Sequence, residues 1–269
     1  MISFPPCKIN LGLNVVAKRP DGYHSIETCF YPVQWTDVLE IIPSEGQTTF
    51  TSSGISIPGS AHENLCLKAY HVLRERFELP PVKIHLHKVV PIGAGLGGGS
   101  SDAAHTLQLL NSVFNLQLST DQLSAYALQL GSDCPFFIHN QPMLGSGRGE
   151  ELSLVQKVLS GKFIVIVKPD LHISTAEAYS NVKPSIPEKA IRDIIEQLPM
   201  HTWREELKND FEDSIFQEYP TLNVIKKAFY QHGALYASMS GSGSAVFGIF
   251  EKEIDFPFQE GTHWSGYSN

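Results

Sequence analysis

The sequence predicts an α+β protein with two domains, and three observations lead to this prediction. Segments that alternate like strands occur between segments with helical spacing, and glycine-containing turns join some of the strands. A strongly apolar strand, GKFIVIVKPD, begins a new series of strands and helices after residue 155. The chain has 269 residues, 42% of them hydrophobic, so a sizeable core is available. We therefore expect an N-terminal domain over 1–155 and a C-terminal domain over 156–269.

In the N-terminal half, the first strand is expected over 7–16, where alternation places Lys8 and Asn10 on the polar face. A turn over 18–27 follows it, punctuated by Pro, Asp and Gly. The remaining strands are expected over 28–43, as one or two strands, over 46–60, as an edge hairpin, and over 82–90. The expected helices cover 63–77, 100–114 and 119–131, with a loop over 132–140.

Residue types at the helix ends support these assignments. Two serines and an aspartate suit the start of the helix over 100–114, Ser119 or Thr120 would cap the next one, and Gly131 would end it. In the C-terminal half we expect a strand over 161–170, helices over 191–198, 203–216 and 221–233, and a strand, glycine turn and strand over 234–250. GSGRGE at 145–150 is expected to be a loop at the domain boundary.

Composition narrows the class of function. The net charge of −8 argues against a nucleic-acid partner, although local cations and backbone amides can still hold an anionic small molecule. The four cysteines have no zinc or redox spacing, and reduced thiols in a cytoplasmic protein are expected. The N-terminal segment lacks the features of a signal peptide, and no apolar run reaches the roughly 20 residues of a membrane helix. No protein partner is indicated.

The densest motif is PIGAGLGGGSSDAA at 91–104, which holds five glycines within seven residues. No lysine follows the last glycine as in a P-loop, no acidic residue ends a following strand as in a Rossmann fold, and the protein-kinase signatures are absent. A strand, a glycine arch and a helix start remain, and these present backbone N–H groups and the positive end of a helix dipole. The motif predicts a phosphate cradle; the alternative is a tight structural turn.

Three stretches together resemble a known family: KINLGLNVVAKRPDGYHSIET, PIGAGLGGGSSDAA and SMSGSGSAVFGIF. In this order and spacing they are similar to the motifs of the GHMP kinases. With PDGYH and GSDCPFF, the chain from residue 7 to about 250 resembles the 4-diphosphocytidyl-2-C-methyl-D-erythritol kinases in particular. The resemblance implies an N-terminal domain like ribosomal protein S5 and a C-terminal ferredoxin-like sandwich. It also implies ATP-dependent phosphorylation of the substrate's 2-hydroxyl in the non-mevalonate isoprenoid pathway.

The resemblance assigns catalysis to Lys8 and Asp133. Asp133 would accept the hydroxyl proton or orient the hydroxyl, and Lys8 would keep Asp133 ionised and stabilise charge at the acceptor oxygen. The residues alone leave simpler interpretations open: a solvated strand lysine, and a loop aspartate that caps nearby amides.

The resemblance also implies that the glycine loop binds ATP, with Mg²⁺ arriving on the nucleotide; no HxxxH or HExxH spacing predicts a metal site in the protein itself. Ser100 and Ser101 would touch the phosphates or Mg²⁺, or would only cap the helix, and Lys88 would approach the nucleotide or be solvated. The candidate ATP-binding residues are Lys88, Pro91, Ile92, Gly93, Ala94, Gly95, Leu96, Gly97, Gly98, Gly99, Ser100 and Ser101.

For the substrate, the resemblance implies that Tyr23 stacks on a cytosine ring and His24 bonds its polar edge, with Asn10 on the acceptor side. Thr175 and Tyr179 match a family threonine and a second stacking aromatic. The alternatives are a packed surface Tyr-His pair and a tyrosine in a helix core. Gly241, Ser242 and Gly243 would form a second glycine turn that shapes the site, or a plain hairpin turn.

Other functions compete with this prediction. A nucleophilic role for Cys134 lacks an identifiable His or Asn partner. Another GHMP kinase acting on homoserine, mevalonate or a sugar would have no cytosine for the GYH motif to bind. A non-catalytic nucleotide-binding protein of the same fold would not need Lys8 and Asp133.

Overall fold

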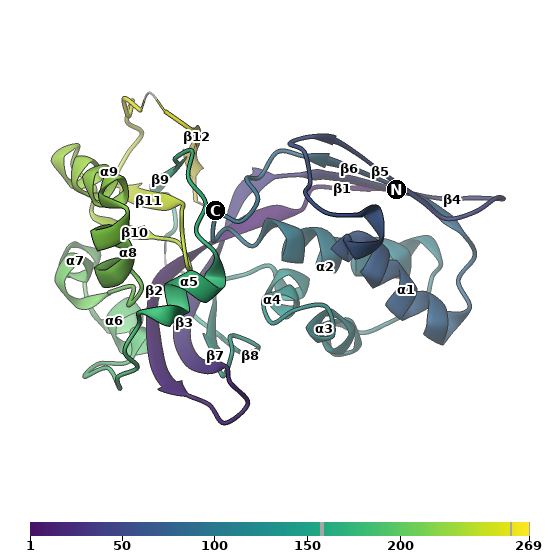
Figure 1. The fold of residues 1–269 in the computed structure, drawn as a ribbon, viewed down its shortest axis with the longest axis horizontal. Helices are drawn as coiled ribbons and strands as arrows, with labels where there is room; N and C mark the ends of the chain where they lie inside the picture. Colours follow the sequence, from purple (N-terminus) through teal and green to yellow (C-terminus); the bar gives the residue numbers. More distant parts are fainter. Residues whose placement is uncertain (157–158, 259, 269) are drawn as a thin grey trace. The chain divides into compact units, whose positions relative to one another are not determined.

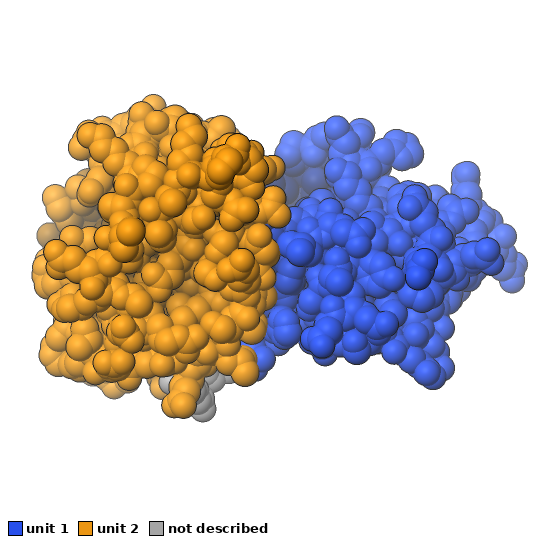
Figure 2. Space-filling model, turned by 90° about the horizontal axis from the view of Figure 1, so that it is seen from below, with its two compact units in different colours: residues 1–7, 35–92, 97–141 blue, residues 8–34, 93–96, 142–269 orange. Residues whose placement is uncertain are grey.

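The computed structural model describes residues 1–156, 159–258 and 260–268 (Figure 1). The chain forms two compact units that alternate along the sequence (Figure 2). Unit 1 contains 1–7, 35–92 and 97–141, and unit 2 contains 8–34, 93–96 and 142–269. The expected domain boundary lies close to 157–158, which are outside the described residues, so a single boundary near residue 155 stays a prediction.

Unit 1 contains a four-stranded sheet in the order β1-β4-β6-β5. Its strands are β1 (Ile2–Ser3), β4 (Val38–Pro43), β5 (Thr49–Gly54) and β6 (Val82–Lys88). The edge hairpin expected over 46–60 is wrong, because β5 pairs in parallel with β6 and helix α1 (Leu65–Phe77) lies on the connection between them. A polar, β-prone stretch predicts a strand, but the partner of that strand depends on tertiary packing.

The other helices of unit 1 are η1 (Ala61–Glu63), α2 (Gly98–Val113), α3 (Thr120–Leu128) and α4 (Cys134–His139). Ser119 caps α3 and accepts a hydrogen bond from the amide of Gln122, as expected. The N-cap of α2 is Gly97, so Ser100 and Ser101 lie inside the helix instead of capping it. The loop expected over 132–140 is wrong, because α4 forms with a proline in its first turn, where no amide donor is needed.

Unit 2 contains two four-stranded sheets, except that the end residues 6–7 and 35–36 of the first sheet belong to unit 1. One has the order β2-β3-β7-β8, with β2 (Pro6–Lys18), β3 (His24–Thr36), β7 (Met143–Ser146) and β8 (Glu151–Leu154). The other has the order β10-β11-β9-β12, with β9 (Phe163–Lys168), β10 (Tyr236–Met239), β11 (Val246–Phe250) and β12 (Thr262–Tyr267). The expected strand, turn and strand over 234–250 is confirmed, because Met239 pairs with Val246 at the end of an antiparallel hairpin.

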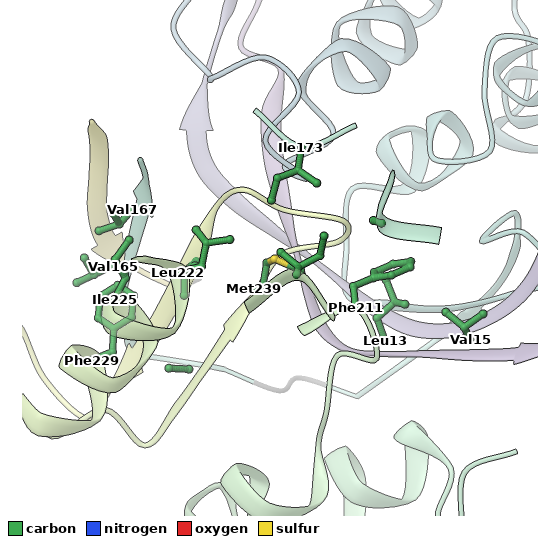
Figure 3. Packing of buried hydrophobic residues seen from close by; sticks show 14 of the residues in the cluster. Leu13, Val15, Val165, Val167, Ile173, Phe211, Leu222, Ile225, Phe229 and Met239 are labelled. Atoms are coloured by element: carbon green, nitrogen blue, oxygen red, sulfur yellow. The ribbon is translucent and has the colours of Figure 1, made fainter. Parts of the chain in front are cut away.

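The helices of unit 2 are α5 (Thr175–Ser180), α6 (Ile191–Gln197), η2 (Met200–Thr202), α7 (Trp203–Glu206), α8 (Glu212–Glu218) and α9 (Pro220–Gln231). The single helix expected over 203–216 is wrong: the chain leaves the helix after Glu206, and Asn209 forms an isolated parallel bridge with Leu13 of β2. A hydrophobic core joins β2, β9, β10 and the helices α8 and α9, and Figure 3 shows Leu13 beside Phe211 within it.

Two features are absent from the described residues. No helix among them is both long and apolar enough to cross a membrane. Within the same residues, no group of three or more His, Cys, Asp or Glu side chains is placed to hold a metal ion.

Candidate active site

Lys8 is a buried cation in unit 2. Strand β2 carries it, and its side chain is only 3% exposed, so the alternative of a solvated strand lysine is wrong. Its ammonium donates to the side-chain oxygen of Asn10 at 2.6 Å and to the backbone carbonyl of Gly95 at 2.8 Å. A buried ammonium needs such acceptors, because burial without them costs several kcal/mol. These two acceptors fix the position of the charge.

Asn10 is itself held in place by a hydrogen bond from its amide nitrogen. Its amide nitrogen donates to the hydroxyl of Thr28 at 2.9 Å, and that hydroxyl donates to the carbonyl of Gly12 at 2.5 Å. The amide therefore presents its oxygen to Lys8, because only its nitrogen can donate to Thr28. Asn10 and Lys8 lie two residues apart on one strand, so they project from the same face, as the alternation predicted.

The glycine loop meets the second glycine turn within unit 2. The Ser240 hydroxyl donates to the Gly95 carbonyl at 2.9 Å, and the Ala245 amide donates to the Ala94 carbonyl at 3.1 Å. Gly95 has φ +75°, and a Cβ there would lie 1.9 Å from the Ser240 carbonyl oxygen. The turn therefore closes the β10–β11 hairpin and also packs against the loop, so a plain hairpin turn is an incomplete description.

The end of the loop, from Gly97, belongs to unit 1 and runs directly into helix α2. The first intrahelical bond runs from the Ser101 amide to the Gly97 carbonyl, so the amides of residues 98–100 precede it. Gly97 has φ +69°, which favours glycine. The Ser101 hydroxyl is fully buried and has no hydrogen-bond partner among the described atoms. Donors without acceptors at a helix N-terminus suit an anion such as phosphate.

Lys88 is buried beside the same helix, at 3% exposure, so the solvated alternative for this residue is wrong. Its ammonium pairs with Asp37 at 2.5 Å and with Asp102 at 2.7 Å. Burial raises the pKa of the Asp102 carboxyl to about 7, although Lys88 works in the opposite direction. Asp37 also accepts the amides of Val89 and Val90, so this cluster secures the start of the glycine loop. A role for Lys88 in binding ATP stays a prediction.

Candidate substrate residues gather in unit 2. The rings of His24 and Tyr179 stack with centroids 4.8 Å apart, and Tyr179 contacts Phe211 edge-on. Tyr23 is 58% exposed, and the Arg148 guanidinium lies 5.0 Å from the centroid of its ring. Thr175 is exposed at the first position of α5, next to the Ser174 cap. The structure thus brings His24 and Tyr179 together, and their contact with a cytosine stays a prediction.

Asp133 lies in unit 1, directly before α4. It occupies the N-cap position, but its side chain makes no capping hydrogen bond to that helix. The neighbouring Cys134 is buried, and burial raises the pKa of its thiol to about 12, which does not suit a nucleophile. Lys8 belongs to unit 2, so a joint action of Lys8 and Asp133 stays a prediction.

Sequence reasoning missed several supporting residues in each unit. In unit 1 they are Asp37 and Asp102, which pair with Lys88. In unit 2 they are Thr28, Asn209 and Ser240. Most of them carry no signal in the sequence, because a polar residue that becomes buried in a site cannot be distinguished there from any other polar residue. Asn209 does carry one, since Asn-Asp inside a predicted helix joins two poor helix formers.

Comparison with known proteins identifies the family. Models described as GHMP kinases N terminal domain and GHMP kinases C terminal match residues 64–141 and 189–256. A 4-diphosphocytidyl-2-C-methyl-D-erythritol kinase of Cytophaga hutchinsonii is 54% identical, over 97% of this chain and 96% of its own length. The chain belongs to the 4-diphosphocytidyl-2-C-methyl-D-erythritol kinase family. It is therefore an enzyme, a kinase of the GHMP class.

Solved structures agree with this family and with the expected fold. A crystal structure of a 4-(cytidine 5'-diphospho)-2C-methyl-D-erythritol kinase has a TM-score of 0.76 at 32% identity, covering 93% of this chain and 90% of that one. A homoserine kinase of Cytophaga hutchinsonii has a TM-score of 0.69 at 16% identity, over 93% of this chain and 86% of its own. The second similarity concerns the fold alone, and the two-domain α+β fold of the GHMP kinases is confirmed.

Proposed function

We propose that this protein transfers the γ-phosphoryl group of ATP to the 2-hydroxyl of 4-diphosphocytidyl-2-C-methyl-D-erythritol, within the non-mevalonate route to isoprenoids. The observation that carries the proposal is the buried ammonium of Lys8, held between Asn10 and the Gly95 carbonyl of the glycine loop. Membership of the family supports the choice of substrate.

The glycine loop is the proposed site for the triphosphate. The amides at the start of α2 precede the first intrahelical hydrogen bond, and the buried Ser101 hydroxyl has no hydrogen-bond partner among the described atoms, which together fit a phosphate group. The backbone from Gly95 to Ser101 would hold this group, with the rest of 91–99 shaping the loop. Mg²⁺, when bound with ATP, would offset the charge of the phosphates.

In the proposed reaction, the bond between the γ-phosphorus and the oxygen that bridges to the β-phosphate breaks. A new bond forms between that phosphorus and the acceptor's 2-hydroxyl oxygen, and ADP leaves. Asp133 takes the hydroxyl proton or orients the hydroxyl, and Lys8 stabilises negative charge at the acceptor oxygen. The fixed position of Lys8 suits this role, since a preorganised charge does not have to rearrange during the reaction.

The aromatic residues of unit 2 are the proposed cytosine site. Tyr23 and Tyr179 would stack on the base, His24 would bond its polar edge, and Thr175 would add a hydroxyl. The stacked pair of His24 and Tyr179 already holds two of these rings close to parallel. We place the reaction in the cytoplasm, since the four cysteines are free thiols and such thiols persist in reducing compartments.

An ADP-release assay tests the proposal. Purified protein with Mg-ATP is given the cytidyl substrate, mevalonate, homoserine or galactose in separate reactions. We expect turnover with the cytidyl substrate, and a loss of several orders of magnitude in Asp133→Asn while ATP binding is retained. Turnover with another alcohol would overturn the cytosine site. ATP binding without turnover on any alcohol would favour a non-catalytic protein.

A further inference from the structure

We propose that Asn209 is a positioning residue for phosphoryl transfer. It holds Ser240 and the second glycine turn that follows it, where the Ser240 hydroxyl contacts the acceptors of Lys8. This inference rests on the proposed function for its catalytic readout. No functional motif in the sequence includes Asn209; its only signal is that Asn209-Asp210 joins two poor helix formers inside the helix expected over 203–216.

Asn209 uses its whole side-chain amide. The residue is 3% exposed, and its nitrogen donates both hydrogens, to the Met239 carbonyl at 2.8 Å and to the Gly241 carbonyl at 2.9 Å. Its oxygen accepts the Phe211 amide at 3.0 Å. The orientation of the amide is determined, because only the nitrogen can face two carbonyls. One side chain thus holds backbone on both sides of Ser240.

The segment that carries Asn209 is fixed to the strand that carries Lys8. The Leu13 amide donates to the Lys208 carbonyl and the Asp210 amide donates to the Leu13 carbonyl, both at 2.8 Å. The Val15 amide donates to the Asp210 carboxylate at 2.7 Å. Figure 3 shows Phe211 beside Leu13 and near Val15 in the core. Because its segment is bonded to β2, Asn209 holds the glycine turn in a fixed position relative to that strand.

Glu212, a little further along the chain than Asn209, bonds the strand that leads into the glycine turn. One of its carboxylate oxygens accepts the Met239 amide at 2.7 Å and the Ser238 hydroxyl at 3.0 Å, and the other pairs with Lys226 at 2.5 Å. Strand β10 is thus held just before the turn, while Asn209 holds the turn itself. Charge-assisted hydrogen bonds of this kind are about twice as strong as neutral ones.

Ser240, directly before the glycine turn, contacts both acceptors of Lys8. The Ser240 hydroxyl lies 2.9 Å from the Gly95 carbonyl and 3.4 Å from the Asn10 side-chain oxygen. Those two oxygens are the ones to which the Lys8 ammonium donates. A shift of the turn would therefore move the charge that the proposed mechanism needs at the acceptor oxygen. Binding of the cytosine would change less, since the side-chain amide of Asn209 bonds none of the proposed cytosine residues.

The test compares Asn209→Asp with Asn111→Asp. An aspartate keeps the size of the side chain but presents an acceptor to two carbonyls. Asn111 is a matched control, since it also bonds one backbone carbonyl and one backbone amide, both of Leu118 in unit 1. We expect kcat of Asn209→Asp to fall about 30- to 100-fold, as for a misplacement of about 1 Å, with the KM of the cytidyl substrate within about threefold of wild type. We expect Asn111→Asp to retain kcat within about twofold.

Ser240→Ala provides a second route if Asn209→Asp does not fold. We expect it to lower kcat about tenfold, and the double variant to lose less than the product of the single losses, because both changes act on one chain of contacts. A folded Asn209→Asp with kcat within about twofold of wild type would overturn the inference. Equal losses in Asn209→Asp and Asn111→Asp would overturn it as well.

Hydrogen–deuterium exchange separates this inference from the proposed function. We expect peptides that cover 93–96 and 240–245 to exchange faster in Asn209→Asp than in wild type, with no change there in Asn111→Asp. If the wild type is inactive but these peptides exchange faster in Asn209→Asp alone, the proposed function is overturned and the role of Asn209 in holding the turn is supported. Unchanged exchange in both peptides overturns the inference, whatever the activity.

Discussion

Replacement of Gly95 by alanine is the sharpest test of how the two glycine segments fit together. Gly95 has φ +75°, and a Cβ would lie 1.9 Å from the Ser240 carbonyl oxygen and 2.9 Å from its carbon. Both atoms are backbone, so no flexible side chain can turn away. The added methyl group must displace the loop or the turn.

The cost follows from two effects. A left-handed backbone costs an alanine about 1–2 kcal/mol. Forcing an extra methyl group into a packed site costs about 1–3 kcal/mol. Together we expect Gly95→Ala to lose about 2–5 kcal/mol of unfolding free energy, a large part of the roughly 5–15 kcal/mol of a typical domain. The displacement would also move the Gly95 carbonyl that holds Lys8, so we expect kcat to fall about 100-fold.

Two control variants separate the two effects. Gly233 also has a positive φ, +86°, but nothing lies within 4 Å of the place that a Cβ would take, so Gly233→Ala should lose only about 1–2 kcal/mol. Gly99 has no positive φ, and the nearest neighbour of a Cβ there is Leu65 at 3.7 Å, so Gly99→Ala in α2 should be neutral or gain up to about 1 kcal/mol.

Urea unfolding of the four proteins, followed by circular dichroism, measures these differences. The expected order of stability is Gly99→Ala, wild type, Gly233→Ala and then Gly95→Ala. Equal stability of Gly95→Ala and Gly233→Ala would refute this explanation, because the contact with Ser240 would then carry no cost.

Three further predictions concern charge and thiols. Lys8→Met should lower kcat about 10²- to 10³-fold in steady-state assays, the loss typical of one donor to developing charge, and a loss below about tenfold would contradict its role. Burial raises the pKa of Asp102 from 3.8 to about 7, so the folded protein holds a proton that the unfolded chain has released, and this contribution to stability is lost as pH rises from about 4 to 7. Urea unfolding at about pH 5 and about pH 8 should therefore differ less in Asp102→Asn than in wild type, and an equal difference would show that Asp102 does not titrate there. All four cysteines are buried, so Ellman's reagent should modify none within about an hour without denaturant and four in urea; rapid native labelling would contradict the packing.

Local patterns predicted most of the strands and helices but not what packs against them. Alternation placed Lys8 and Asn10 on one face of a strand, and the capping residue of α3 was correct. Alternation does not tell whether a polar face is covered, however, and here both faces of β2 are buried from its first residue to Val15. The burial of Lys8, which gives the charge its fixed position, therefore could not be predicted from the sequence.

The errors share a physical cause, which is contact with distant parts of the chain. The expected helix over 203–216 breaks because Asn209 bonds a carbonyl 30 residues away, and no helical spacing records that bond. Strand β5 pairs in parallel with β6, and no local turn signal in the sequence predicts that pairing. Helix α4 has only six residues, too few to show a helical period.

The central claim is that a phosphoryl group moves from ATP to an alcohol of the cytidyl substrate. Phosphorus NMR of the wild-type enzyme with Mg-ATP and 4-diphosphocytidyl-2-C-methyl-D-erythritol tests it most directly. We expect a new phosphomonoester resonance that grows in step with ADP, while the diphosphate resonances of the substrate persist. Growth of ADP with inorganic phosphate alone, or no change in either nucleotide, would contradict the claim.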